Sequence, residues 1–482
     1  MPIKSTPNLN VPLTPEQKKA RQARKKAEKE ARKAAAKERL SKRPSCNTFI
    51  GEHKWLGGAV DPKTGDIFGI PSHAISVICI SPPKDESEPI QGDDSNTRAQ
   101  ISTIPLPNEY KDCKFKWLRG IVHEGYLYGI PAWSTHGVLK VRLEPRSRHT
   151  RGPRVKVLPL PKDASFYQTR EELKEGDVIQ RGKYEYSGVD RSRWMWHGGQ
   201  IGNSFDGEAI YCIPSNSEHV LKVNLKTEEL TEFGPALTDG QNKFYGGIKG
   251  LDGCIYGMPY TATGVIRIDP STDSVEILGD YPLGGYKWHG GLLAHSTGVI
   301  YAFPAHANEV LCVDTNIVPE RDGDQSWRVS TIPIQRHEND TDTAEQQYKW
   351  LGGSYGADGC IYGMPSDATS ILRIDPIKNE AYTFGKVPAN KNKWQGGSLS
   401  KIDDCIYAVP ADHDNILRID TNPDTPLSID FVGKFIDDCE DKWQGSFVGR
   451  DGRMYAIPEN CSNVMVITPS KEKKNVSVDM LL

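Results

Sequence analysis

Lysines stand at one fixed place in a motif that the chain repeats eight times. The motif reads approximately Lys-Trp-x-Gly-Gly, then Asp-Gly-x-Ile-Tyr-Gly-x-Pro, then Val-Leu-Arg-Ile-Asp-Pro after a short loop. Each lysine directly precedes an anchor aromatic residue, and only the third copy departs, with Met195. The lysines are Lys54, Lys116, Lys243, Lys287, Lys349, Lys393 and Lys442. Cations gathered on one side of a protein favour the binding of an anionic group.

Other polar residues fall near these lysines. The residue after the anchor varies from copy to copy, and in an extended strand it points to the same side as the lysine. This variable position holds Leu56, Leu118, His197, Tyr245, His289, Leu351, Gln395 and Gln444. The loops that follow the second strand hold His73, His136, His219, His306 and His413. A ligand on this side would meet imidazole, amide and phenol groups that can set specificity.

The repeat predicts four short strands in each copy. Trp-x-Gly-Gly begins the first strand, an Asp-Gly turn leads to the Ile-Tyr strand, and a proline ends that second strand. The third strand is expected at 265–269 and 371–375, and the fourth is short and polar, as at 274–278. Four-stranded units repeated radially form a β-propeller, whereas solenoid rungs are shorter and more regular. We therefore expect an all-β, eight-bladed β-propeller, with seven as the alternative blade count.

Two interpretations of the lysine-bearing face are open. If the strands alternate in direction, the loops after the second and fourth strands surround the mouth of a central channel. In the first interpretation, the lysines are solvated and the histidines are ordinary loop residues. In the second, this face binds an anionic or polar ligand. The candidate binding residues are Lys54, Lys116, Lys243, Lys287, Lys349, Lys393, Lys442, His197, Tyr245, His289, Gln395, Gln444, His306 and His413.

The charge of the chain divides it into two parts. Residues 1–43 carry 14 Lys or Arg against 4 Glu, hence +10, so the net charge of −3 leaves −13 for residues 44–482. We expect a basic, helical or disordered tail over 1–45, followed by the propeller over 46–482 with insertions near 81–100, 162–192 and 316–347. The tail has no apolar face, so it is either solvated or bound to an anionic partner such as RNA through residues 16–43.

The ten cysteines do not form a disulfide pattern. Four of them (Cys212, Cys254, Cys360 and Cys405) hold similar places in the second strand, and such places on different blades lie too far apart to bridge. We interpret them as buried small residues in a reducing compartment. No apolar run reaches membrane length and no signal peptide is recognisable, so we expect a cytoplasmic or nuclear protein, neither secreted nor membrane-bound. We expect no metal and no cofactor, since no CxxC pair occurs.

The order of features resembles the kelch repeat, with a glycine-containing first strand, an Asp-Gly turn, Ile-Tyr and Val-x-x-Ile-Asp-Pro. The second strand departs from it, because it ends in Gly-Met-Pro at 257–259 and 363–365 and not in a glycine pair. The repeat is also similar to the streptogramin-lyase type of propeller, a resemblance that implies a ligand-binding or lyase scaffold with a magnesium ion held by histidines and a glutamate. No His-x-Glu-x-His arrangement is present, so no catalytic residue carries over. Over residues 54–470 the repeats look most like uncharacterised propeller repeats of unicellular eukaryotes.

Three functional hypotheses follow. The first is a non-catalytic interaction or scaffold protein that binds a protein partner through the loop face, with the tail adding electrostatic attachment. The second is a small-ligand binder or lyase-type enzyme with a histidine-lined channel mouth. It predicts that at least three of six side chains converge, namely His197, His289, His306, His413, Glu309 and Asp412. The third is association with RNA through the tail, and no sequence-specific reading of DNA is expected.

Overall fold

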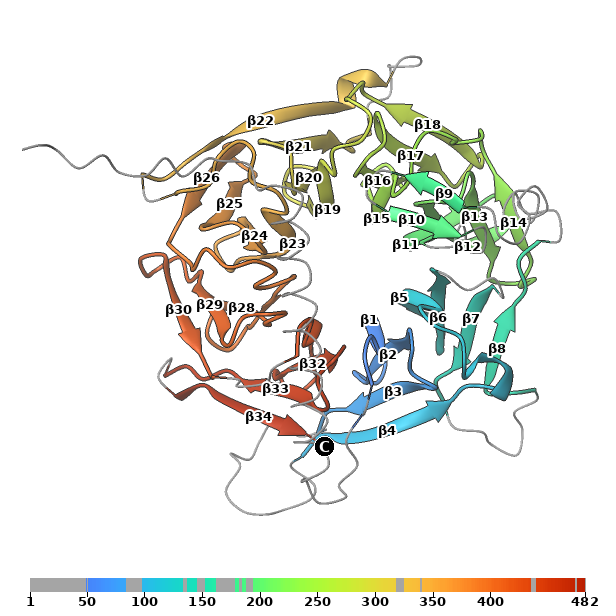
Figure 1. The fold of residues 1–482 in the computed structure, drawn as a ribbon, viewed down its shortest axis with the longest axis horizontal. Helices are drawn as coiled ribbons and strands as arrows, with labels where there is room; N and C mark the ends of the chain where they lie inside the picture. The colour runs from blue at the N-terminus through green and yellow to red at the C-terminus, as the bar shows by residue number, and fades with distance from the viewer. Residues whose placement is uncertain are drawn as a thin grey trace, which may run out of the picture.

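The computed structural model describes residues 49, 51–83, 98–132, 137–144, 152–161, 178–181, 184–187, 194–317, 325–338, 340–434, 439–472 and 475–481. Four-stranded sheets stand radially around a central channel, which makes the chain an all-β β-propeller as the repeat predicts (Figure 1). The 3-10 turns η2 (Asn108–Tyr110) and η4 (Ser326–Arg328) are short. Among the described residues, no helix is long and apolar enough to cross a membrane. The predicted tail at 1–45, His136 and most of the 162–192 insertion lie outside the described residues.

The strands occupy four positions from the channel outward. The innermost strands are β1 (Trp55–Val60), β5 (Trp117–His123), β11 (Trp196–Ser204), β15 (Phe244–Lys249), β19 (Trp288–Ala294), β23 (Trp350–Tyr355), β27 (Ser398–Leu399) and β31 (Trp443–Val448). The second strands are β2 (Ile67–Pro71), β6 (Tyr126–Pro131), β12 (Gly207–Pro214), β16 (Ile255–Pro259), β20 (Val299–Pro304), β24 (Ile361–Pro365), β28 (Cys405–Ala408) and β32 (Met454–Pro458). The third strands are β3 (Ser76–Ser81), β7 (Val138–Arg142), β13 (Val220–Asn224), β17 (Val265–Asp269), β21 (Glu309–Asp314), β25 (Ile371–Asp375), β29 (Ile416–Asp420) and β33 (Val464–Thr468). The outermost strands are β4 (Gln100–Pro105), β8 (Val155–Leu158), β14 (Leu230–Phe233), β18 (Ser274–Leu278), β22 (Val329–Gln335), β26 (Glu380–Phe384), β30 (Ser428–Val432) and β34 (Ser477–Leu481).

Each sheet follows chain order with antiparallel neighbours, so the chain moves outward through one sheet and returns to the channel to begin the next. Two sheets are joined at their outer edges, where Ile334 of β22 pairs in parallel with Ala381 of β26 to give one eight-stranded sheet. A separate two-stranded sheet is formed by β9 (Val178–Arg181) and β10 (Tyr184–Ser187).

The anchor aromatics fill the spaces between neighbouring sheets. At most 4% of each side chain is exposed, for Trp55, Trp117, Trp196, Phe244, Trp288, Trp350, Trp394 and Trp443 alike. Every one of the seven indoles donates from Nε1 to a backbone carbonyl at the start of the third strand, as Trp350 does to Ser370 at 2.9 Å. This bond satisfies the polar atom of each buried indole, so the ring can pack at a sheet interface without an unpaired donor.

The ring closes between the last sheet and the first. One hydrophobic cluster packs Trp55 and Ile67 of the first sheet against Tyr455 and Ile457 of the last. The innermost strands β1 and β31 are also in contact. Because innermost strands surround one axis, the first strand of each sheet decides which side chains face the channel (Figure 1).

Candidate functional site

The lysines before the anchors are buried, which corrects the expectation that they are solvated. Their exposed fractions lie between 0% and 8%, and they are absent from the lining of the channel cavity. Lys116 donates from Nζ to the carbonyl of Ser72 at 2.6 Å, and Lys393 donates to that of Ser366 at 2.9 Å. Each carbonyl belongs to the loop after the second strand of the preceding sheet. The lysines therefore join neighbouring sheets, a role that a lysine at the start of a strand does not reveal in the sequence.

Most of these ammonium groups share this arrangement. Five of the seven lysines donate to a carbonyl in the loop after the second strand of the preceding sheet. Lys287 donates instead to Pro282 and Gly284, just before its own strand, and among the described residues Lys243 is the exception without such a bond. Burial lowers the pKa to about 8 for Lys54, Lys116, Lys243, Lys287, Lys349 and Lys393. Burial therefore disfavours the charged form of these lysines, and the carbonyl oxygens that six of the seven ammonium groups contact offset part of that cost.

A break in strand pairing turns the variable position toward the channel. In β1, β5, β11, β19, β23 and β31 the register shifts between the anchor and the second glycine of the pair. The two residues between them have no partner in the ladder, so strict alternation of side chains ends there. The variable residue therefore does not follow the lysine, as alternation alone predicted. In five of these six strands it lines the channel instead, whereas Leu56 of β1 is buried outside the lining.

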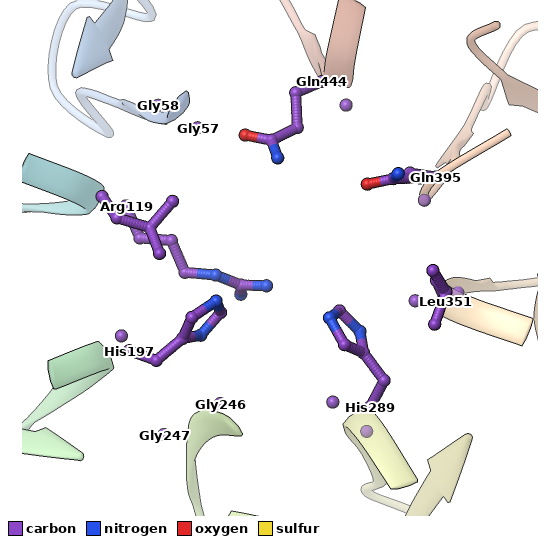
Figure 2. Close-up of a pocket in the computed structure, with 18 of the residues that line it drawn as sticks. Gly57, Gly58, Arg119, His197, Gly246, Gly247, His289, Leu351, Gln395 and Gln444 are labelled. Carbon is purple, nitrogen blue, oxygen red and sulfur yellow. The ribbon is translucent and has the colours of Figure 1, made fainter. Parts of the chain in front are cut away.

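These residues line a channel cavity of about 530 Å³ together with many glycines. On one side lie His197 and His289, and on the other lie Leu351, Gln395 and Gln444 (Figure 2). The sequence predicted four of these five residues as binding candidates and left Leu351 out. A cavity of this size lies within the range that small-molecule sites occupy, about 300–1,000 Å³.

Tyr245 departs from the other variable residues. In β15 it pairs with Met258 and the register shifts one residue later, between Gly246 and Ile248. Tyr245 is accordingly not among the residues that line the cavity. Its ring lies 3.7 Å from the ring of His197 and 4.7 Å from that of His289, centre to centre. The predicted channel position of Tyr245 is thus corrected to a place packed against the two channel histidines.

Arg119 is the channel residue that the sequence analysis missed. It occupies the first place of the glycine pair, which holds glycine in the other seven copies. Its φ is 60°, in the left-handed region that glycine adopts freely and that costs other residues about 1–2 kcal/mol. The side chain extends toward the middle of the channel, near His197 and His289 (Figure 2). The signal was present in the sequence as Trp117-Leu118-Arg119-Gly120, one arginine in a column of glycines.

The guanidinium of Arg119 has no counter-charge in the cavity. No aspartate or glutamate lines it, and within the described part of the chain no hydrogen bond or ion pair joins Arg119 to another side chain. The side chain is open to the space of the channel, yet the surrounding ring of protein lowers the pKa of Arg119. A cation that is exposed to a channel without acidic lining residues can pair with an anion that enters from solution.

The two channel histidines are held neutral. Burial, and then the charge of Arg119, lowers the pKa of His289 to about 3. The same two causes, with His289 third, lower the pKa of His197 well below its ordinary value. The Nδ1 atoms of both rings are buried and have no hydrogen-bond partner among the described residues. Both imidazole rings lie beside the guanidinium of Arg119 (Figure 2).

The other predicted histidines do not join this group. His306 packs against Tyr286 and Tyr348, with its ring 4.6 Å from that of Tyr348. His413 packs on Trp394 at 4.4 Å, also outside the cavity lining. Of the six side chains whose convergence the lyase hypothesis requires, only His197 and His289 meet, with ring centres 6.4 Å apart.

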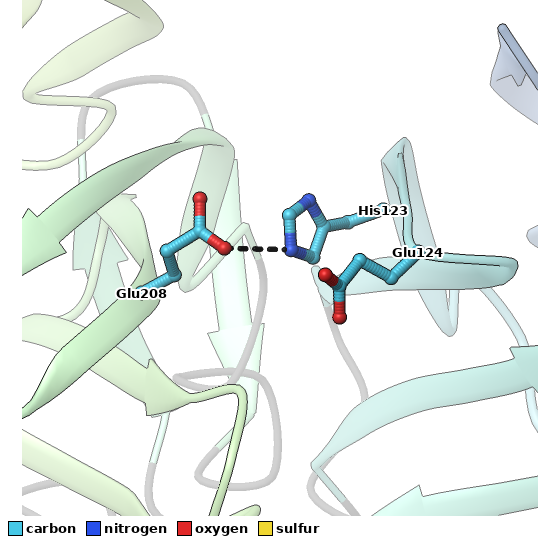
Figure 3. A group of neighbouring side chains, drawn as sticks. All are labelled: His123, Glu124 and Glu208. Carbon is cyan, nitrogen blue, oxygen red and sulfur yellow. Dashed lines mark ion pairs between the residues drawn. The ribbon is translucent and has the colours of Figure 1, made fainter.

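A separate cluster of possible metal ligands lies away from the channel. His123, Glu124 and Glu208 bring their ligand atoms within 4.8 Å of one another, at the turns between first and second strands of two neighbouring sheets (Figure 3). His123 Nε2 and Glu208 Oε2 are 3.1 Å apart. Both glutamates are exposed, and exposed acidic groups of this kind are common without an ion. In the part of the chain that the structure describes, no other such group was found.

Comparison with known proteins adds structural likeness only. No protein-family model matches the chain, and no curated protein matches it. A solved streptogramin B lyase is 12% identical with a TM-score of 0.47, over 90% of this chain and 96% of that chain. Virginiamycin B lyase from Staphylococcus aureus is 12% identical with a TM-score of 0.46, and the match covers 87% of this chain and 96% of that one. Apo AztD from Citrobacter koseri is 13% identical with a TM-score of 0.42, and the match covers 79% of this chain and 87% of that one. The likeness concerns the β-propeller fold alone, and the resemblances to kelch repeats and to repeats of unicellular eukaryotes remain predictions.

Proposed function

We propose that this protein is a ligand-binding β-propeller that holds a small anion in its central channel. The ring is inferred to have eight blades, with the eight-stranded sheet counted as two blades joined through β22 and β26. One observation carries the proposal, namely that the guanidinium of Arg119 faces a channel whose lining contains no acidic residue. An anion beside it would supply the missing counter-charge.

The surrounding groups suit an oxyanion. A guanidinium presents several N–H donors in one plane, which fits the two oxygens of a carboxylate. Each neutral imidazole carries one N–H donor, so His197 and His289 can add hydrogen bonds without adding charge. Gln395 and Gln444 supply amide donors from the opposite wall, although Gln395 already donates to Asn392 Oδ1 at 2.6 Å. These groups can bind and orient a ligand.

Thermal unfolding of the full chain with acetate or sulfate tests this function. An anion that binds only the folded protein raises Tm as its concentration increases. The rise should be larger in the wild type than in Arg119→Gly, because sulfate also stabilises folded proteins without a specific site. Lys401→Gln, which removes an exposed positive charge elsewhere, serves as the control and should respond like the wild type. Equal responses of the wild type and Arg119→Gly would reject the proposed site.

The broader hypotheses drawn from the sequence remain predictions. A protein partner on the loop face, RNA on the tail and a cytoplasmic or nuclear location are each untested. A pull-down with the full chain and with a chain lacking residues 1–45 distinguishes the first two. Loss of a salt-sensitive partner on deletion would favour the tail, and an unchanged set of partners would favour the loop face.

A further inference from the structure

The junction between the last sheet and the first depends on one loop, residues 459–462, which follows β32. The backbone N–H of His53 donates to Asn460 Oδ1 at 2.6 Å. Lys54 donates twice to the carbonyl of Glu459, from its backbone N–H at 3.1 Å and from Nζ at 2.7 Å. These partners lie 407 and 405 positions apart in the sequence, so we call residues 459–462 the closing loop. The closing loop holds the start of the first sheet against the last sheet.

The closing loop contains a cysteine whose sulfur lies beside that of a second cysteine. The sulfurs of Cys461 and Cys439 are 3.4 Å apart. Their segments are held side by side, because the backbone N–H of Cys461 donates to the carbonyl of Lys442 at 3.3 Å, and Asn460 donates from Nδ2 to that of Glu440 at 2.7 Å. A disulfide bond requires sulfurs about 2.05 Å apart, so these two need to approach by only about 1.4 Å. Rotation of the two side chains can supply a movement of that size.

The two thiols differ in their access to solvent. Only 2% of Cys461 is exposed, whereas Cys439 is partly exposed. A small oxidant therefore meets Cys439 first, and Cys461 can attack that sulfur from within the protein, as in redox-sensing pairs. Buried cysteines of the strands offer a contrast, since burial raises the pKa of Cys212 and raises that of Cys312 to about 12. Such thiols rarely form the reactive thiolate.

A cation lies close to the pair. Burial lowers the pKa of Lys54 to about 8, and the negative charges of Cys461 and Cys439, once ionised, are the next influences and oppose that change. The attraction is mutual, so the ammonium of Lys54 favours the thiolate form of both cysteines. The thiolate is the nucleophile in disulfide exchange. The surroundings of the pair therefore favour the reacting form.

We propose that Cys439 and Cys461 form a reversible redox pair, which is oxidised by exchange with a small disulfide such as glutathione disulfide. The thiolate of Cys439 attacks one sulfur of glutathione disulfide, so a mixed disulfide forms and one glutathione thiolate leaves. The thiolate of Cys461 then attacks the sulfur of Cys439, which forms the protein disulfide and releases the second glutathione thiolate. The two thiol protons pass through solvent to the two glutathiones, and two electrons pass from the protein to glutathione disulfide. Excess reduced glutathione reverses both steps.

Oxidation should restrain the junction between the two sheets. The disulfide would fasten the closing loop to the segment before β31, and the closing loop carries the bonds to His53 and Lys54. Amide hydrogen exchange at His53 and Lys54 should therefore be slower in the oxidised protein, since exchange requires these bonds to open. Asn242 and Lys243 hold the same places in the fourth copy, and their backbone N–H groups are bonded to the preceding sheet in the same way. Exchange at these two residues should not change, which makes them the matched control.

Mass spectrometry of the full chain after incubation with glutathione disulfide tests the pair. In the wild type, the peptides that hold Cys439 and Cys461 should lose two hydrogens, and reduced glutathione should restore both thiols. Cys461→Ser should instead keep glutathione on Cys439, because the thiol that completes the exchange is gone. Cys439→Ser should leave the buried Cys461 unmodified, and it gives a second variant if Cys461→Ser folds poorly. Cys113→Ser removes another partly exposed thiol and should oxidise at the pair like the wild type.

The outcomes separate the two parts of the proposal. A disulfide in the wild type, retained glutathione in Cys461→Ser and slower exchange at His53 and Lys54 support both parts. Glutathione that stays on Cys439 of the wild type, or two thiols that stay unmodified, would overturn the redox pair. A disulfide that forms without any change in exchange at His53 and Lys54 would confirm the pair and overturn its effect on the junction. None of these results depends on the anion site.

Discussion

Replacing Arg119 by glycine should stabilise the protein while removing its anion site. Arg119 has a φ of 60° at a place where the other copies have glycine. A left-handed conformation costs a non-glycine residue about 1–2 kcal/mol, and glycine gives back about 0.4–1 kcal/mol through the greater freedom of its unfolded chain. The backbone alone therefore predicts a gain of about 0.5–1 kcal/mol.

Two further variants divide this gain into its causes. Arg119→Ala removes the charge and keeps the strained backbone. Its free energy of unfolding should therefore be about 0.5–1 kcal/mol lower than that of Arg119→Gly. Gly290→Ala places a Cβ at a φ of 69°, where no atom lies within 4 Å of it. Its free energy of unfolding should therefore fall below that of the wild type by a similar amount, through the backbone alone. Urea unfolding measures these differences in a buffer whose only anion is chloride. The variants are compared where the dependence of unfolding free energy on urea concentration is the same.

The order of stabilities can refute the reasoning. The account requires Arg119→Gly to be more stable than Arg119→Ala, and the ligand-free wild type to be no more stable than either. A wild type that is clearly more stable than Arg119→Gly would mean that the guanidinium has a stabilising partner inside the protein. Arg119 would then have a structural role, and its side chain would no longer be evidence for a ligand.

Three shorter predictions concern other groups. Replacing Lys116 by methionine removes the ammonium that donates to the carbonyls of Ser72 and Cys113, and it should lower the free energy of unfolding by about 1–3 kcal/mol. The same change at exposed Lys111 should cost almost nothing, and equal urea midpoints for the two variants would contradict this. The pKa of His289 is lowered from 6.5 to about 3 in the folded protein, so between these pH values the imidazole is protonated in the unfolded chain and neutral in the folded one. The free energy of unfolding should therefore fall as the pH drops from about 6.5 toward about 3. His289→Gln should flatten that part of the curve, and an unchanged slope would show that His289 does not contribute. The sulfurs of Cys439 and Cys461 are 3.4 Å apart, so these residues should form a disulfide under mild oxidation. Mass spectrometry would detect the disulfide as the loss of two hydrogens from the linked peptides, and peptides that stay reduced would refute the prediction.

The sequence predicted the strands well because the motif repeats the same local chemistry. The expected strands at 265–269, 274–278 and 371–375 are β17, β18 and β25. Gly-containing turns, the aromatic of the second strand and its closing proline are local signals, and they locate a strand without any knowledge of its neighbours. The burial of the anchor tryptophans follows from the same pattern.

The site was predicted only in part, because its geometry depends on contacts between copies. A lysine at the start of a strand looks solvated, and only the structure shows that a carbonyl of the preceding sheet receives the Nζ of Lys116. Strand alternation misplaced Tyr245, since the register shift moves by one residue in that copy. Arg119 could have been found from the sequence by comparing each column of the repeat. The glycine pair was interpreted as structural, and its two exceptions, Arg119 and Ser446, were not proposed as site residues.

Anomalous diffraction from crystals of the full chain soaked in selenate tests the central claim most directly. Selenate is an oxyanion whose selenium atom can be located without ambiguity. The account predicts a selenium peak in the channel beside the guanidinium of Arg119, and its absence in Arg119→Gly crystals. Selenate bound elsewhere on the protein with an empty channel would contradict it.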